Sequence, residues 1–238
     1  MNPIITVSGV SKHYPDSNQD QQALDNISFT LSSGQVLGLL GHNGAGKSTL
    51  INALLGAHRY SGNIEINGLD PIENHAELMK HLAYISDVNV LPEWMTIKQI
   101  LTYTSGVHPC FDINKALSVL EKTNIKLNSK ISGLSKGMKV QVHLALVIAT
   151  NVKELILDEP TLGLDLLYRD SFYSNLMEWF NQGERCLIIA SHEVSEIEKL
   201  LTDVLILKQG NCVKFDTMQN IPQGTLADLF ITLQKEPV

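Results

Sequence analysis

Apolar residues in this 238-residue chain follow two spacings, one typical of strands and one typical of helices. Alternating or short continuous apolar runs, bounded by glycine and polar turn residues, predict strands. The expected strands span 4–10, 24–31, 35–40, 63–68, 82–85, 155–157, 186–190, 204–207 and 212–215. The last two should form a hairpin across Gln209-Gly210-Asn211.

Longer stretches with helical periodicity separate these strands. The expected helices span 50–55, 72–80, 96–103, 113–122, 136–150, 167–181, 193–200 and 225–234. Asp112 and Ser135 stand where N-caps belong. Residues 87–150 lack the apolar spacing typical of strands. We therefore predict an α-helical subdomain there, inserted into an α/β core of residues 1–86 and 151–238. The pattern indicates a mainly parallel sheet with an antiparallel N-terminal β-subdomain.

One glycine-rich stretch stands between the predicted strand 35–40 and the predicted helix 50–55. It reads Gly41-His42-Asn43-Gly44-Ala45-Gly46-Lys47-Ser48-Thr49 and fits the spacing G-x-x-x-x-G-K-[ST]. Glycines let successive backbone N–H groups face one phosphate, and a helix N-terminus adds further donors. Lys47 would neutralise the β- and γ-phosphates, and Ser48 would bind Mg²⁺. A chance glycine-rich turn is the alternative, but the flanking strand and helix favour a P-loop NTPase core.

A second motif, Leu155-Ile156-Leu157-Asp158-Glu159, ends an apolar strand in two adjacent carboxylates. Side chains at the carboxyl end of a strand in an open α/β sheet reach the ligand crevice. Asp158 would then orient Mg²⁺, and Glu159 would take a proton from the attacking water. Alone, such a pair is more often a solvated strand end; the phosphate loop upstream favours the catalytic interpretation.

Composition narrows the class of protein. The net charge of −7 disfavours a nucleic-acid binder, which would show a basic stripe. The three cysteines match no zinc or redox spacing and suit a reducing cytosol. We expect no signal peptide and no membrane-spanning run, since no segment reaches 18 apolar residues.

With both motifs in place, the chain resembles the ATP-binding cassette (ABC) family over nearly its whole length. Leu134-Ser135-Lys136-Gly137-Met138 is similar to the signature motif of the family, which would hold the γ-phosphate of ATP bound to a second subunit. Asp165, in Gly163-Leu164-Asp165, resembles the D-loop at the dimer interface. His192 is similar to the switch histidine, and Tyr14 to the aromatic residue that stacks on adenine.

Three positions, in two motifs, depart from the family pattern. Asp87 falls where the family usually has the Q-loop glutamine; it can accept contacts from Mg²⁺ or water but cannot donate, and we expect it to remain a sensor with altered Mg²⁺ dependence. Lys136 and Met138 replace the usual glycine and glutamine of the signature motif. Because Ser135 and Gly137 are kept, binding should survive.

The resemblance implies an ATPase that requires ATP and Mg²⁺. It also implies a homo- or heterodimer, in which two nucleotide-binding subunits are joined head-to-tail. Its partner would be an integral membrane permease in a separate chain, so the expected location is cytoplasmic, on the inner face of the membrane. Trp94, Met95, Tyr103 and Phe111 would line the permease groove or, equally well, form the core of the insert. Three segments resemble bacterial exporter-type cassettes: 91–112, 136–138 and 226–230. A soluble family member without a permease and a regulatory nucleotide-binding module are the alternatives.

Overall fold

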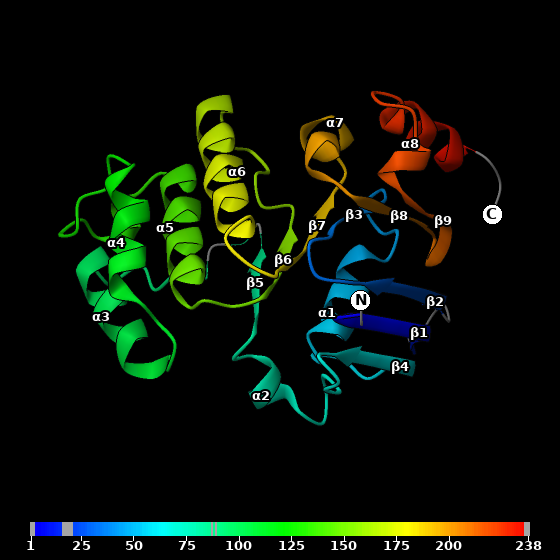
Figure 1. Cartoon of the computed structure of the whole chain (residues 1–238), viewed down its shortest axis with the longest axis horizontal. Helices are drawn as coiled ribbons and strands as arrows, with labels where there is room; N and C mark the ends of the chain where they lie inside the picture. Colours follow the sequence, from blue (N-terminus) through cyan, green and yellow to red (C-terminus); the bar gives the residue numbers. More distant parts are fainter. Residues whose placement is uncertain (1–2, 16–20, 87, 89, 236–238) are drawn as a thin grey trace. The chain divides into compact units, whose positions relative to one another are not determined.

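The computed structural model describes residues 3–15, 21–86, 88 and 90–235. The chain divides into two compact units. The first contains residues 1–79, 156–158 and 185–238, and the second contains residues 80–155 and 159–184. Figure 1 gives the element labels used below.

An antiparallel β-layer opens the first unit. It consists of β1 (Ile5–Tyr14), β2 (Gln21–Leu31) and β4 (Ser61–Ile66), with β1 in the middle. Ile5 pairs with Leu31 on one side and with Ile66 on the other. The predicted antiparallel β-subdomain is therefore confirmed. β1 extends beyond the predicted Val10, because Tyr14 still pairs with Gln21 of β2.

The parallel part of the first unit surrounds β3 (Val36–Leu40), all five residues of which are buried. β3 is parallel to β7 (Cys186–Ser191) and to β8 (Asp203–Lys208). β8 is followed by the antiparallel strand β9 (Asn211–Thr217), and β9 pairs with β2. The strand order in this unit is therefore β4-β1-β2-β9-β8-β3-β7, followed by the carboxyl end of β6 (Glu154–Asp158). The hairpin turn is two residues long: Gln209 and Gly210 both have positive φ, as a type I′ turn requires.

Among the described residues, the first unit has four α-helices. They are α1 (Lys47–Leu54), α2 (His75–Leu78), α7 (Val194–Ile197) and α8 (Leu226–Lys235). The predicted helix 72–80 is wrong in its first part, because Asp70 Oδ1 accepts hydrogen bonds from the N–H groups of Ile72 (2.7 Å) and Glu73 (2.9 Å) and holds a turn there. The predicted helix 193–200 is divided into α7 and a 3₁₀ turn, Glu198–Leu200.

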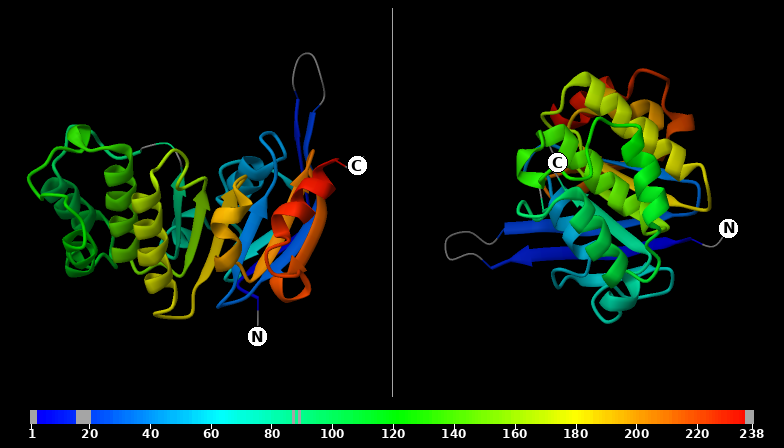
Figure 2. Two further views of the ribbon diagram at one scale, coloured as in Figure 1. Left: turned by 90° about the horizontal axis from the view of Figure 1, so that it is seen from above. Right: turned by 90° about the vertical axis from the view of Figure 1, so that its left-hand side faces the viewer.

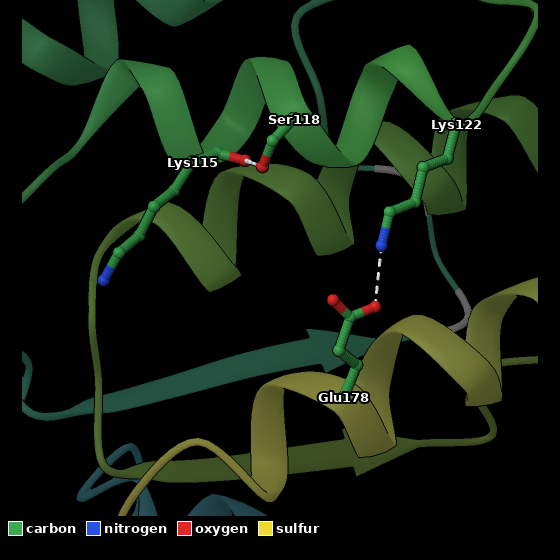
Figure 3. Close-up of polar contacts among 4 residues, drawn as sticks. All are labelled: Lys115, Ser118, Lys122 and Glu178. Atoms are coloured by element: carbon green, nitrogen blue, oxygen red, sulfur yellow. Dashed lines mark hydrogen bonds and ion pairs between the residues drawn. The ribbon is translucent and has the colours of Figure 1, made fainter.

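The second unit is mostly helical. It holds β5 (Leu82–Ser86), the start of β6, α3 (Ile97–Val107), α4 (Ile113–Glu121), α5 (Lys136–Ala149) and α6 (Leu166–Phe180). α5 lies between α4 and α6 and is buried at most of its positions (Figure 2). An ion pair of 2.6 Å joins Lys122, just after α4, to Glu178 of α6 (Figure 3).

Side-chain caps define where these helices begin. Thr96 forms a capping box with Gln99 at the start of α3, and Asp165 accepts a hydrogen bond from Tyr168 N at the start of α6. The predicted caps Asp112 and Ser135 are confirmed at α4 and α5. Within the part of the chain that the structure describes, no helix has both the length and the apolar composition needed to cross a membrane.

Candidate active site

The glycine-rich loop lies in the first unit, between the end of β3 and the start of α1. Its backbone enters left-handed conformations at Gly44 (φ 81°) and Gly46 (φ 109°), and Gly46 is the N-cap residue of α1. A Cβ atom on Gly46 would lie 2.7 Å from the carbonyl oxygen of Ala23. Both the backbone angle and the space therefore require glycine at this position.

Lys47 is buried, with 6% of its surface exposed. Its ammonium Nζ donates to the carbonyl of Gly41 at 2.6 Å and lies 3.5 Å from the carbonyl of His42. The same His42 carbonyl accepts the N–H of Ala45 at 3.0 Å, which closes the loop. The loop backbone thus holds the lysine charge within the concavity that the sequence motif predicts for phosphates.

Ser48 and Asp158 meet in the same unit, although 110 positions separate them in the sequence. Ser48 Oγ donates to Asp158 Oδ2 at 3.1 Å. A hydroxyl and a carboxylate are oxygen ligands of the kind that Mg²⁺ accepts, so these residues fit that ion. The described residues contain no group of three or more His, Cys, Asp or Glu that could hold a metal. Mg²⁺ here would need oxygen atoms from the phosphates, which is its usual mode of binding.

His192 follows the last residue of β7. Leu40 pairs with Ser191, so the phosphate loop and His192 leave the same edge of the sheet from neighbouring parallel strands. Ser191 Oγ accepts the N–H of Glu193 at 3.0 Å, which shapes the turn that carries the histidine. The pairing places His192 where a side chain reaches the ligand crevice of an α/β sheet.

Tyr14, at the end of β1, is 36% exposed and contacts two side chains. The Lys12 ammonium lies 4.8 Å from the ring centroid, and the His58 ring meets it edge-on at 6.1 Å. Lys12 Nζ also donates to the Arg59 carbonyl at 2.7 Å. His58 lies 44 positions from Tyr14, so no local pattern could have identified it.

The segment Leu134–Met138, called the signature segment below, belongs to the second unit. Ser135 is exposed and caps α5 by accepting Met138 N at 3.3 Å, and Leu134 is buried. Lys136 Nζ donates to the Leu162 carbonyl at 2.6 Å. The unusual lysine at this position therefore binds the segment that leads to Asp165.

Gly137 contacts the start of α6. A Cβ atom at this position would lie 2.7 Å from Cγ of Tyr168. Real Cβ atoms do not approach a ring so closely, so only glycine allows the N-terminal turn of α5 to pack on Tyr168. Lys136 and Gly137 thus attach the signature segment to the segment around Asp165 within one unit.

Glu159 opens the second unit's second segment and has φ 48°, in the left-handed region. Its carbonyl accepts Leu162 N at 3.2 Å, which stabilises this turn. A non-glycine residue held in this region costs about 1–3 kcal/mol and is often found at functional positions. Asp87, the predicted sensor, lies outside the described residues.

Known proteins match the chain along most of its length. A family model described as ABC transporter matches residues 24–162. A manganese transport system ATP-binding protein of Halalkalibacterium halodurans is 30% identical over 242 residues, which cover 97% of this chain and 89% of that protein.

Solved structures agree with this family match. A structure of an ATP-binding subunit of an ABC transporter aligns with a TM-score of 0.85 at 25% identity, over 98% of this chain and all of that one. A dimeric ATP-binding cassette with bound ADP and phosphate aligns with a TM-score of 0.77 over 90% of this chain and 98% of that one. At 19% identity, this second likeness shows the fold alone.

Proposed function

The chain belongs to the ABC transporter family as an ATP-binding, ATP-hydrolysing subunit that powers transport, and we propose that it works as one half of a head-to-tail dimer. In this dimer the phosphate loop, Gly41–Thr49, of one copy and the signature segment, Leu134–Met138, of the other enclose one ATP. The observation that carries the ATP site within one copy is the Ser48–Asp158 contact, because it joins the two motifs that the sequence assigns to phosphate and Mg²⁺. Ser135 is exposed at the N-terminus of α5, which suits a phosphate brought by a second copy.

The roles of the side chains follow from their chemistry. The backbone N–H groups of the loop and Lys47 bind the β- and γ-phosphates, and Tyr14 stacks on the adenine. Ser48 and Asp158 would hold Mg²⁺, and Asp87 would be a further ligand. The chemistry that Mg²⁺ would supply there is partial neutralisation of the phosphate charge.

The phosphoryl group passes through a loose transition state, so hydrolysis depends mainly on a positioned water and on stabilisation of charge. A base then takes the proton that this water loses. We assign the base to Glu159, whose carboxylate accepts a proton from the attacking water. His192 donates to the γ-phosphate and holds Glu159 and the water in line. The left-handed backbone of Glu159 supports this assignment, because such strain is common at catalytic positions.

Replacing the proposed base tests the assignment directly. Glu159→Gln keeps the shape of the side chain but cannot take a proton, so the variant should bind ATP, release no phosphate and accumulate as a dimer with ATP. Phosphate release and light scattering after size-exclusion chromatography measure the two effects. A Glu159→Gln protein that hydrolyses ATP at the normal rate would contradict the role of Glu159.

A membrane permease in another chain is the proposed partner, at the inner face of the membrane. Trp94 is 71% exposed, and its loop is fixed on both sides: Ser132 N donates to the Glu93 carbonyl and Ile131 N to the Met95 carbonyl. Lys139 also binds the Glu93 carboxylate at 2.6 Å. A large ring held outward on a rigid loop suits docking of a partner helix.

The other predicted groove residues differ from Trp94. Tyr103 is 58% exposed and is therefore accessible to a partner, whereas Met95 is 9% exposed and belongs to the core of the second unit. Trp94→Asp should leave ATP affinity unchanged and reduce the share of the chain that sediments with membranes. The solvent-facing substitution Lys153→Asp is the matched control, and equal losses for both variants would contradict the proposed surface. Export as the direction of transport stays a prediction.

A further inference from the structure

The C-terminal helix α8 contacts the phosphate loop directly. Its buried face includes Leu226 (0% exposed) and Phe230 (5%), whereas Ile231 on the other side is 48% exposed. The Phe230 ring lies 5.3 Å from the ring of His42, at an interplanar angle of 53°. His42 is the second residue of the loop, so α8 reaches the proposed ATP site from a segment almost 190 positions away.

A second set of contacts holds α8 beside the first loop residue. Gln234 Nε2 donates to the Leu207 carbonyl at 3.0 Å, and Lys208 Nζ donates to the Leu233 carbonyl at 3.1 Å. The Leu207 oxygen lies 2.9 Å from the position that a Cβ atom on Gly41 would take. The last turn of α8 is therefore fixed to the backbone that adjoins Gly41.

The other end of α8 is held by the segment that follows His192. Glu198 Oε1 accepts the N–H groups of Gly224 (3.0 Å) and Leu226 (3.3 Å), where a carboxylate also suits the positive end of the helix dipole. Glu198 begins the 3₁₀ turn directly after α7. α8 thus joins the His192 segment to the phosphate loop within the first unit.

We propose that α8 positions the phosphate loop for ATP, with the Phe230–His42 contact as the point of control. The His42 carbonyl accepts Ala45 N and lies near Lys47 Nζ, so a shift of His42 moves the groups that hold the lysine charge. Small displacements of positioned groups cause large losses of binding and rate. Phe230 is a positioning residue here, and the inference rests on the proposed role of the loop in binding ATP.

Isothermal titration of the full chain with ATP and with ADP tests the inference. Phe230→Leu keeps an apolar side chain and removes the ring; it should raise the Kd for both nucleotides by about three- to tenfold, which is the range expected for loss of an aromatic contact. Ile231→Ala, on the exposed side of the same helix, should bind as the unchanged chain does. A loss of folded protein would lower the binding stoichiometry and leave the Kd as it is, which separates positioning from stability.

His42→Ala supplies a second measurement, because it removes the same ring contact from the side of the loop and leaves Phe230 in place. It should raise the Kd for ATP to a similar extent. The double variant His42→Ala with Phe230→Leu should have a Kd no higher than that of the single variant that binds ATP less tightly. An unchanged Kd for Phe230→Leu, or effects that multiply in the double variant, would overturn the proposal. Normal ATP binding by Lys47→Ala would instead contradict the role of the loop itself.

Discussion

The phosphate loop and the signature segment are both glycine-containing turns that lead into a helix, yet their side chains are arranged differently. In the loop, the polar groups contact one another: Lys47 binds the Gly41 carbonyl and Ser48 binds Asp158. In the signature segment, the polar groups serve the helix and the turn behind it, as Lys136 binds the Leu162 carbonyl. Ser135 is left at the exposed helix terminus.

This difference indicates that the two segments would bind the phosphates of ATP in different ways. In the proposed dimer, the loop would act as a preformed receptor whose charge and hydroxyl are already placed, whereas the signature segment would be a surface that receives a phosphate from the other copy. Changes in the loop should therefore reduce ATP binding by a single chain. Changes in the signature segment should leave that binding intact and reduce turnover, which needs two copies.

The largest expected effect comes from Lys47. Lys47→Ala removes a buried ammonium that would make charge-assisted hydrogen bonds to phosphates, so the Kd for ATP should rise by roughly a hundredfold. Titration calorimetry measures this, with the exposed Lys153→Ala as a control of equal charge. If Lys47→Ala bound ATP as tightly as the control, the comparison between the two segments would fail.

The sequence predicted the loop well because its signal is local. A strand, a fixed glycine spacing and a helix occupy one continuous stretch, and Gly46 leaves no conformational alternative. The helix caps Asp112 and Ser135 were predictable for the same reason. The predicted start of a helix at residue 72 was wrong because the Asp70 side chain binds the backbone N–H groups there. The spacing of apolar residues does not reveal such a contact.

The contacts that distinguish the two segments could not be predicted, since each joins distant parts of the chain. Nothing near Lys136 in the sequence indicates its bond to Leu162, and nothing near His42 indicates Phe230. The lysine looked like a departure from the family pattern, whereas the structure gives it a partner. The family resemblance therefore suggested these positions, and the fold shows which groups the residues found there contact.

A change of pH should affect the second unit through α5. Burial lowers the pKa of His143 on this helix to about 4, below its ordinary value of 6.5, so the neutral form is favoured in the folded chain. The unfolded chain binds the proton more readily than the folded chain. The stability that depends on neutral His143 is therefore complete above pH 6.5 and is lost as the pH falls towards 4. The loss at pH 5 should be about 2 kcal/mol relative to pH 7.

Urea unfolding at pH 5, 6 and 7 measures this dependence. His143→Gln cannot titrate, so its free energy of unfolding should fall less between pH 7 and pH 5 than that of the unchanged chain. His81→Gln, at an exposed position in the same unit, is the control and should keep the full dependence. Parallel pH profiles for the two variants would show that His143 is not the responsible group.

The smallest expected change in stability, and the sharpest test of the comparison, is at Gly137. Gly137→Ala places a methyl group against the Tyr168 ring, so α5 must shift at its first turn, at a cost of about 1.5 kcal/mol. Ser135 moves with that turn. Turnover should therefore fall about tenfold, in line with a misplaced phosphate contact, while the Kd of the single chain for ATP stays unchanged.

Two further variants separate the clash from the loss of glycine. Gly133→Ala is the control, since no atom lies within 4 Å of the added Cβ, and it should keep both turnover and stability. Combining Gly137→Ala with Tyr168→Leu removes the ring and should restore part of the turnover, because the methyl group then has space. If Gly137→Ala weakened ATP binding by the single chain as much as it slowed turnover, the signature segment would belong to the same receptor as the loop. The distinction between a preformed receptor and a docking surface would then be wrong.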